Sequence, residues 1–309
     1  MLVLIFSKMQ DKYMNVFNKQ KSKDKILLVI PILNPSSDFF ETILDRISAQ
    51  SIKNKIVLIN SGDRISAKLD CDVRDIKKEE FNHANTRNIA KQYEADFYLF
   101  MTQDASPFDD KLIEKLLEPF RDENVMVSYA KQIPYNNAHI TEVFARGKNY
   151  PENSIIKSKK DIKDMGIKTF FSSDSCAMYR GDYFNKMGGF KKDLNGSEDM
   201  EFAARAILDN KKVAYCAEAK VYHSHIYNMK KIYDRYFLIG VFFKENSWIE
   251  ESLSDTYKTE STGRKQVLEE MIYILKNQPS AIFKSITYNI IKYLAYKVGK
   301  YHSRGGDAI

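Results

Sequence analysis

Cysteine is scarce in this chain of 309 residues, which has three, at Cys71, Cys176 and Cys216. Their number is odd, they lie far apart, and they form no Cys-x-x-Cys pair. This usage excludes a disulfide framework and argues against a cysteine zinc site. We therefore expect a protein of a reducing compartment, the cytoplasm.

Long apolar runs are missing as well. The apolar run at residues 2–6 is interrupted by Lys8, Asp11 and Lys12 before it reaches the length of a signal peptide. No other stretch approaches the roughly 20 apolar residues of a transmembrane helix. Internal repeats and low-complexity tracts are also absent. The sequence thus predicts neither a secreted precursor nor a membrane-spanning protein.

A hydrophobic content of 44% suits one large core with a smaller appendage. We expect an N-terminal lead over residues 1–24, a main domain over 25–245, and a basic helical extension over 246–309. The net charge of +7 favours an anionic partner, which could be nucleic acid, a phosphate-bearing substrate or an acidic membrane surface. Charge alone does not choose among them.

Strand and helix patterns alternate through the first half of the chain. Continuous apolar runs at residues 26–33, 55–60 and 97–101 are typical of strands buried on both faces of a parallel sheet. Helical patterns follow them at 36–47, from Asn85 or Thr86 to Tyr93, and at 109–120. The second half predicts a helix at 198–208 and two short strands before His223. This order predicts a doubly wound α/β sheet, which binds ligands beyond the carboxyl ends of its strands.

Six segments in order carry a family resemblance: residues 29–35 (VIPILNP), 81–88 (FNHANTRN), 102–105 (TQDA), 166–171 (GIKTFF), 196–200 (GSEDM) and 221–225 (VYHSH). Together they resemble the inverting family 2 glycosyltransferases of the GT-A fold, and more narrowly their bacterial rhamnosyltransferase-like branch. The likeness covers about residues 26–245. It implies a Rossmann-like mixed sheet flanked by helices. It also implies transfer of a sugar, with rhamnose from dTDP-rhamnose leading, to a polysaccharide or lipid-linked acceptor of capsule, O-antigen or cell-wall synthesis.

A divalent cation, Mg²⁺ or Mn²⁺, is expected at Asp104. This residue ends a buried strand and offers a hard oxygen ligand for the charge of a nucleotide diphosphate. Most members of the family have two acidic residues here, whereas this chain has Gln103 and Ala105 around Asp104. The resemblance adds a histidine ligand, His223 or His225. Because the two alternate along a predicted strand, we expect only one, preferably His223, to enter the site. The alternative is that Asp104 merely caps a turn.

The resemblance assigns the catalytic base to Asp199, beside Glu198 at the start of a helix. A helix N-terminus favours the ionised carboxylate, whereas the neighbouring charge of Glu198 opposes it. The alternative is that both acids only cap the helix. For the acceptor side, the segment at 166–180 suggests Ser173 and Asp174.

The expected donor contacts lie in the loops after the predicted strands and in the 81–88 segment. There, Arg87 would meet phosphate, or else form only a solvated salt bridge. Many members have aspartate where this chain has Asn60. The full set of expected donor-binding residues is Pro31, Ile32, Asn34, Asn60, Ser61, Asp63, His83, Arg87, Gln103 and Asp104.

The C-terminal extension combines apolar spacing with lysines. Ile282, Ile286, Ile290 and Leu294 recur every four residues, and five cations accompany them: Lys284, Lys292, Lys297, Lys300 and Arg304. A basic, tyrosine-rich helix of this kind suits peripheral attachment to the inner face of the plasma membrane, or packing on the main domain. Two other functions stay open: a nucleic-acid-binding protein, although no such motif is present, and a non-catalytic scaffold of a polysaccharide assembly complex.

Overall fold

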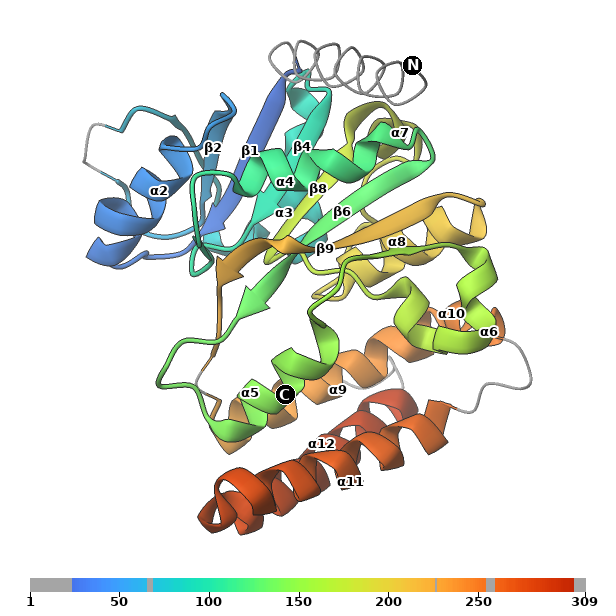
Figure 1. Cartoon of the computed structure of the whole chain (residues 1–309). Coiled ribbons are helices and arrows are strands. Elements are labelled where there is room, and N and C mark those ends of the chain that lie inside the picture. Colours follow the sequence, from blue (N-terminus) through green and yellow to red (C-terminus); the bar gives the residue numbers. More distant parts are fainter. Residues whose placement is uncertain (1–23, 66–68, 226, 254–258, 303–309) are drawn as a thin grey trace, which may run out of the picture.

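The computed structural model describes residues 24–65, 69–225, 227–253 and 259–302, with the side chains of 259–262 left out. The expected N-terminal lead, apart from Asp24, and Arg304 lie outside these ranges. A central sheet crosses the molecule, and most of the C-terminal helices are stacked on one side of it (Figure 1).

The sheet has nine strands, and eight follow the order β3-β2-β1-β4-β8-β6-β9-β5, while β7 pairs with β9. Their bounds are β1 Ile26–Ile32, β2 Lys55–Asn60, β3 Asp72–Asp75, β4 Phe97–Met101, β5 Ser106–Pro107, β6 Val125–Ile133, β7 Ile155–Lys157, β8 Cys176–Arg180 and β9 Lys212–Tyr222. The first four strands are parallel neighbours, whereas β8 runs antiparallel to β4 and β6. The mixed sheet of the predicted α/β fold is confirmed.

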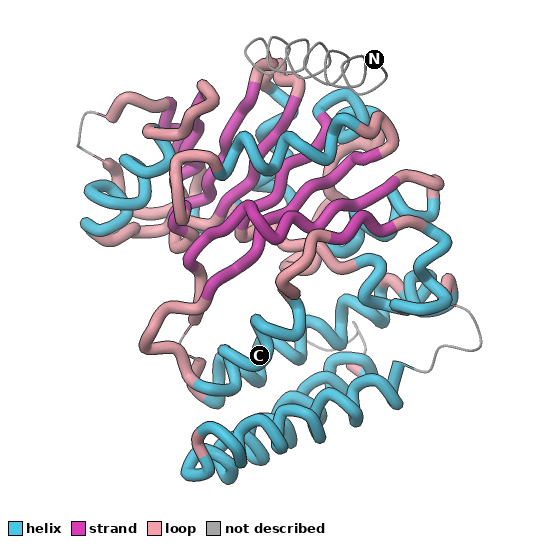
Figure 2. Tube along the Cα trace, viewed as in Figure 1, coloured by secondary structure: helices cyan, strands magenta, loops and turns pink. Residues whose placement is uncertain are grey.

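Helices cover both faces of the sheet; in Figure 2 the cyan helices lie in front of and behind the magenta strands. The α-helices are α2 Leu44–Ser48, α3 His83–Asn88, α4 Leu112–Leu117, α5 Ile140–Asn149, α6 Ile162–Met165, α7 Gly181–Lys186, α8 Glu198–Leu208, α9 Met229–Glu245, α10 Ser247–Glu251, α11 Thr259–Asn277 and α12 Ile282–Tyr301. Shorter helical turns, at Phe39–Ile43 and Glu118–Arg121 among others, extend or connect them.

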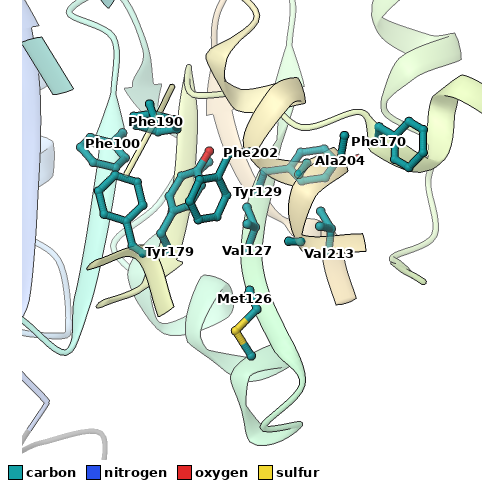
Figure 3. Close-up of a cluster of buried hydrophobic side chains, with 14 of the residues drawn as sticks. Phe100, Met126, Val127, Tyr129, Phe170, Tyr179, Phe190, Phe202, Ala204 and Val213 are labelled. Carbon is teal, nitrogen blue, oxygen red and sulfur yellow. The ribbon is translucent and has the colours of Figure 1, made fainter. Parts of the chain in front are cut away.

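Two apolar cores result, one on each face of the sheet. The first lies beneath α2 and α4 and takes its side chains from one face of β1, β2 and β4. The second lies beneath α3, α7 and α8, where the aromatic rings of Phe100, Tyr179, Phe190 and Phe202 pack edge to face (Figure 3). Side chains that alternate along each strand feed the two cores, which explains the continuous apolar runs in the sequence.

Two local predictions differ from the structure. The helix expected from Asn85 or Thr86 begins at His83, because the Asn82 side chain accepts the amides of Ala84 and Asn85. The two short strands expected before His223 are one strand, β9, whose pairing with β6 shifts register between Ala130 and Lys131. Such an irregularity interrupts the alternation without ending the strand.

The C-terminal helices form a layer of their own. Gly240 of α9 and Gly299 of α12 permit close contact, since a Cβ atom on Gly299 would lie 2.1 Å from the carbonyl oxygen of Phe237. Helix α11 packs against α5 and α12. Within the described ranges, no helix combines the length and the apolar character that crossing a bilayer requires.

Candidate active site

Three predicted ligands meet where β4 and β9 end. The distance from Asp104 Oδ1 to His223 Nε2 is 3.3 Å, and from Asp104 Oδ2 to His225 Nδ1 is 3.4 Å. All three ligand atoms lie within 4.8 Å of one another. Both histidines therefore enter one site, and the expectation that only one does so is wrong. Strand β9 ends at Tyr222, so the alternation of a strand no longer applies beyond it.

Hydrogen bonds fix the tautomer of the neutral His223 ring. Arg146 can only donate, so the end of the Gln132 amide that it contacts is the oxygen Oε1. The same oxygen lies 2.8 Å from His223 Nδ1, while Gln132 Nε2 donates to Ser173 Oγ at 2.7 Å. His223 Nδ1 then carries the hydrogen, and in the neutral imidazole this leaves a lone pair on Nε2.

That lone pair is what makes a cation site. His223 is 4% exposed, and its Nε2 atom has no hydrogen-bond partner although a carboxylate oxygen faces it. Two facing acceptors repel each other unless a proton or a cation lies between them. Burial, together with the nearby His223, lowers the pKa of His225 to about 4, so this imidazole is neutral and free to coordinate near pH 7. One carboxylate and two imidazoles are a donor set for a divalent cation.

Gln103 has a structural task in place of the family's usual acid. Its Oε1 accepts the Leu33 amide at 2.7 Å, and its Nε2 donates to the Leu33 carbonyl at 3.3 Å. The side chain thus ties the loop after β1 to the loop after β4. Both ends of the Gln103 amide therefore serve loop positioning, and its expected contact with the donor stays a prediction.

Asp199 sits in the first turn of α8 with both carboxylate oxygens held. Oδ2 accepts a hydrogen bond from the Asp174 amide at 3.1 Å, and Oδ1 accepts one from the amide of the next residue, Met200, at 2.7 Å. Burial and the charge of Glu198 raise the pKa of Asp199 to about 6, against the opposing effect of these hydrogen bonds and of Arg87. A carboxylate with a pKa near neutrality is suited to accept a proton from a hydroxyl.

Arg87 is buried in a charge cluster, and its expected contact with phosphate is corrected. Its Nη1 lies 3.0 Å from Glu198 Oε1, and its Nε lies 3.6 Å from Asp174 Oδ2. Only 4% of the Arg87 side chain is exposed. The guanidinium therefore offsets the charge of Glu198 and Asp174 beside Asp199, and Glu198 is the ion-pair partner of Arg87.

Asp174 is likewise internal and not an accessible acceptor contact. It is 3% exposed and receives the Tyr179 hydroxyl at 2.6 Å. Burial raises the pKa of Asp174 well above its usual value. Ser173 is partly exposed and binds Gln132, so it lies beside the metal ligands.

The 81–88 segment positions the loop before Asp199, a role that sequence reasoning missed. Asn82 and Asn85 donate to Asn195 and Asp193, and Asn88 exchanges two hydrogen bonds of 2.8 Å with the Phe190 backbone. Three asparagines at a spacing of three residues share one face of the helical segment, and that periodicity was the available signal. They hold the loop that leads into Asp199. His83 is exposed at the start of this helix, 3.5 Å from Arg87 Nη1.

The loops after β1 and β2 form a second edge of the site. The Asn60 amide is used internally, donating to the Asp63 carbonyl and to Asp75 Oδ1 at 2.9 and 2.8 Å. Ser61 Oγ donates to the Ile32 carbonyl at 3.1 Å. Asn60 and Ser61 are buried, so their direct contact with a nucleotide is not supported.

Accessible groups at this edge are Asn34, Asp63 and the unpredicted Asp75, all exposed. Asn34 Oδ1 accepts the Asp63 amide at 2.7 Å. Pro31 and Ile32 belong to β1, and Ile32 is buried. These two residues shape the floor beneath the loop and offer little side-chain surface to a ligand.

The Asp104–His223–His225 cluster and Asp199 share one edge of the sheet. The Thr102 amide donates to the Ser175 carbonyl at 3.3 Å, which joins the Asp104 loop to the segment whose Asp174 amide binds Asp199. A site that combines divalent-cation ligands, a carboxylate with a raised pKa and open loops after parallel strands suits a group-transferring enzyme that acts on phosphorylated substrates.

Comparison with known proteins specifies this class. Residues 27–188 match the model of glycosyl transferase family 2, and the chain belongs to that family of enzymes. It is 38% identical to the O-antigen chain rhamnosyltransferase RfbN of Salmonella typhimurium (strain LT2), over 90% of each chain. It is 41% identical to the O-antigen chain rhamnosyltransferase WbaN of Salmonella anatum, over 73% of this chain and 71% of that one.

Solved structures agree on the fold. The mannosyltransferase PcManGT from Pyrobaculum calidifontis, in complex with GDP-Man and Mn²⁺, has a TM-score of 0.59 at 11% identity, over 90% of this chain and 87% of that one. Residues 1–349 of S. aureus TarS give a TM-score of 0.54 at 14% identity, over 89% and 90%. These likenesses confirm the GT-A type architecture. Family membership favours a transferase over the scaffold and nucleic-acid alternatives.

Proposed function

We propose that this enzyme transfers rhamnose from dTDP-rhamnose to a saccharide or lipid-linked acceptor in O-antigen synthesis, with inversion at the anomeric carbon. The observation that carries the proposal is the placement of Asp199, with a pKa of about 6, on the same edge as the Asp104–His223–His225 cluster. The similarity to two O-antigen rhamnosyltransferases along most of the chain supports the choice of sugar.

The reaction is a single displacement. The acceptor hydroxyl oxygen attacks the anomeric carbon, its proton passes to Asp199, and the bond from that carbon to the diphosphate oxygen breaks with the electron pair leaving on the nucleotide. A divalent cation, when bound, would offset the charge that grows on the diphosphate. Two of the three protein ligands are imidazoles, which a first-row transition metal accepts more readily than Mg²⁺ does, so of the two expected cations we propose Mn²⁺.

Donor choice is tested with purified enzyme and a panel of dTDP-, UDP- and GDP-sugars. We expect calorimetry to show the tightest nucleotide binding for dTDP, and NMR of the product to show the anomeric configuration inverted. Clearly tighter binding of UDP or GDP would reject the thymidine donor. A product with retained configuration would reject the single displacement.

We further propose that the enzyme attaches peripherally to the cytoplasmic face of an anionic membrane. Among the described residues, nine exposed large apolar side chains lie on α11 and α12: Leu268, Ile272, Leu275, Phe283, Ile290, Tyr293, Leu294, Val298 and Tyr301. Helix α12 carries four lysines and no acidic residue. An apolar helical face with cations beside it suits an anionic lipid interface. Of the stripe expected from the sequence, Ile290 and Leu294 are exposed, whereas Ile282 and Ile286 are partly buried.

A triple variant tests the attachment without truncating the packed helices. Serine at Phe283, Ile290 and Leu294 should abolish cosedimentation with phosphatidylglycerol vesicles. Ile156→Ser on β7, where the side chain is about as exposed as Ile290 and Leu294, should leave it intact. The wild type should also release in high salt, because each lysine near the surface contributes about 1 kcal/mol. Undiminished vesicle binding by the triple variant would reject the role of this face.

A further inference from the structure

A small pocket adjoins the metal cluster on the side away from the β1 and β2 loops. It holds about 150 Å³ and lies between α5, α9 and α12, the helices stacked below the sheet in Figure 1. His225 forms part of its wall, and Tyr227 packs on His225 with ring centroids 5.3 Å apart. The pocket thus begins where the cation site ends.

The pocket carries excess positive charge. Three cations line it, namely Arg146, Arg235 and Lys292, against one carboxylate, Glu142. Arg146 forms an ion pair with that carboxylate, with 2.7 Å between Arg146 Nη2 and Glu142 Oε1. Within the described part of the chain, no carboxylate lies at ion-pair distance from Arg235 or Lys292; Arg235 Nη1 donates to the Tyr227 hydroxyl at 3.0 Å, and Lys292 lies 5.8 Å from the centroid of the Tyr236 ring.

Guanidinium and ammonium groups that outnumber the carboxylates around a pocket of this size can bind a phosphate-type anion. Tyrosines complete the wall and supply hydroxyl donors, among them Tyr227 and Tyr236. The Tyr288 hydroxyl is already used, since it donates to the Tyr227 carbonyl at 3.1 Å. The ligand that the pocket favours is therefore a phosphate or a diphosphate.

The position of the pocket selects which molecule carries the phosphate. The donor edge, with Asn34, Asp63 and Asp75, follows β1, β2 and β3 at the opposite end of the sheet order from β9, which leads into His223 and His225. A phosphate in the pocket would lie across the cation site from that edge. It belongs to the acceptor side.

Helix α12 relates the pocket to the apolar face. Lys292 lines the pocket, whereas Ile290 and Leu294, two positions away in each direction, are exposed. A separation of two residues places side chains on nearly opposite sides of a helix, which is about 10–12 Å across. With its outer face sunk about 5–10 Å into a membrane interface, α12 would hold the pocket at the depth of lipid headgroups.

We propose that this pocket, lined by Arg235, Lys292 and Arg146, binds the phosphate or diphosphate group of a lipid-linked acceptor and so presents the acceptor sugar to Asp199. The proposal rests on the transferase function proposed above and adds the chemical class of its acceptor. Charge-assisted hydrogen bonds to a phosphate account for an affinity gain of about ten- to a hundredfold.

The first test measures binding without catalysis. Inorganic pyrophosphate is titrated calorimetrically into the full chain freed of metal, as wild type, Arg235→Gln, Arg235→Lys and Lys292→Gln. We expect roughly ten- to a hundredfold weaker binding for both glutamine variants and partial recovery for Arg235→Lys. Lys231→Gln, an exposed position of α9 outside the pocket, is the matched control and should bind as the wild type does. Equal affinity in all variants would overturn the proposal.

The second test separates the two sources of phosphate. Arg235→Gln should raise KM for an acceptor sugar on a lipid diphosphate and leave KM for the neutral octyl glycoside of that sugar unchanged. Its affinity for dTDP in the presence of Mn²⁺ should also be unchanged. A loss of dTDP affinity of the same size would assign the pocket to the donor and overturn the proposal. Absence of rhamnosyl transfer in the wild type would reject the proposed function, while pyrophosphate binding would still decide the pocket.

Discussion

Replacing Gln132 with methionine removes the oxygen that accepts the His223 Nδ1 hydrogen at 2.8 Å, with little change in side-chain volume. The imidazole then loses the contact that fixes its tautomer, and Nε2 no longer keeps its lone pair toward Asp104. Removal of such a partner of a metal-bound histidine costs about 10–100-fold in metal affinity. This corresponds to about 1.4–2.8 kcal/mol of binding free energy.

Glutamate at the same position provides the contrast. Gln132→Glu keeps an oxygen for His223 and another charge partner for Arg146, so its affinity for Mn²⁺ should equal or exceed that of the wild type. Titration of Mn²⁺ by electron paramagnetic resonance measures both variants directly. Ser128 lies on β6, as Gln132 does, and Ser128→Ala removes its buried contact with Cys216 of β9, so this variant should bind Mn²⁺ normally. An affinity of Gln132→Met within twofold of the wild type would refute the tautomer argument.

Two further predictions concern pH and packing. Because the pKa of Asp199 is raised to about 6 and the base must be unprotonated, kcat/KM should fall tenfold per pH unit below that value and stay level above it; a profile that stays level down to pH 4 would contradict this origin. Gly299→Ala should lower the free energy of unfolding in urea by about 1–3 kcal/mol, since its Cβ would meet the Phe237 carbonyl oxygen at 2.1 Å. Gly263→Ala, with no atom within 4 Å of the added Cβ, should cause no loss, and equal effects of the two changes would show that helix contact is not the cause.

Much of the α/β framework could be predicted because burial leaves a local signature. The runs at 55–60 and 97–101 coincide with β2 and β4, and the helix expected at 198–208 is α8. Strands that are buried on both faces and flanked by polar turns can be predicted from the local sequence alone. The same logic placed Asp104 at a strand end, beside the sheet's ligand-binding edge.

The predictions that failed depend on contacts between distant residues. The residues around Arg87 in the sequence do not indicate that Glu198 and Asp174 lie next to it. The sequence therefore suggests that Arg87 binds phosphate, whereas in the structure it pairs with these two acids. Likewise, nothing in the sequence indicates that the Asn60 amide donates to Asp75, which is 15 residues away. His223 and His225 can lie in one site because β9 ends at Tyr222, one residue before His223. The pattern VYHSH does not indicate this boundary.

The central claim, that Asp199 removes the acceptor proton while Asp104 holds the cation and the diphosphate, is tested most directly by single-turnover transfer from bound dTDP-rhamnose. Asp199→Asn should keep donor affinity and lose about 10²–10⁴-fold in rate, the usual contribution of a positioned base. Asp104→Asn should instead weaken donor binding, in a manner that depends on added Mn²⁺. Transfer by Asp199→Asn at close to the wild-type rate would contradict the account.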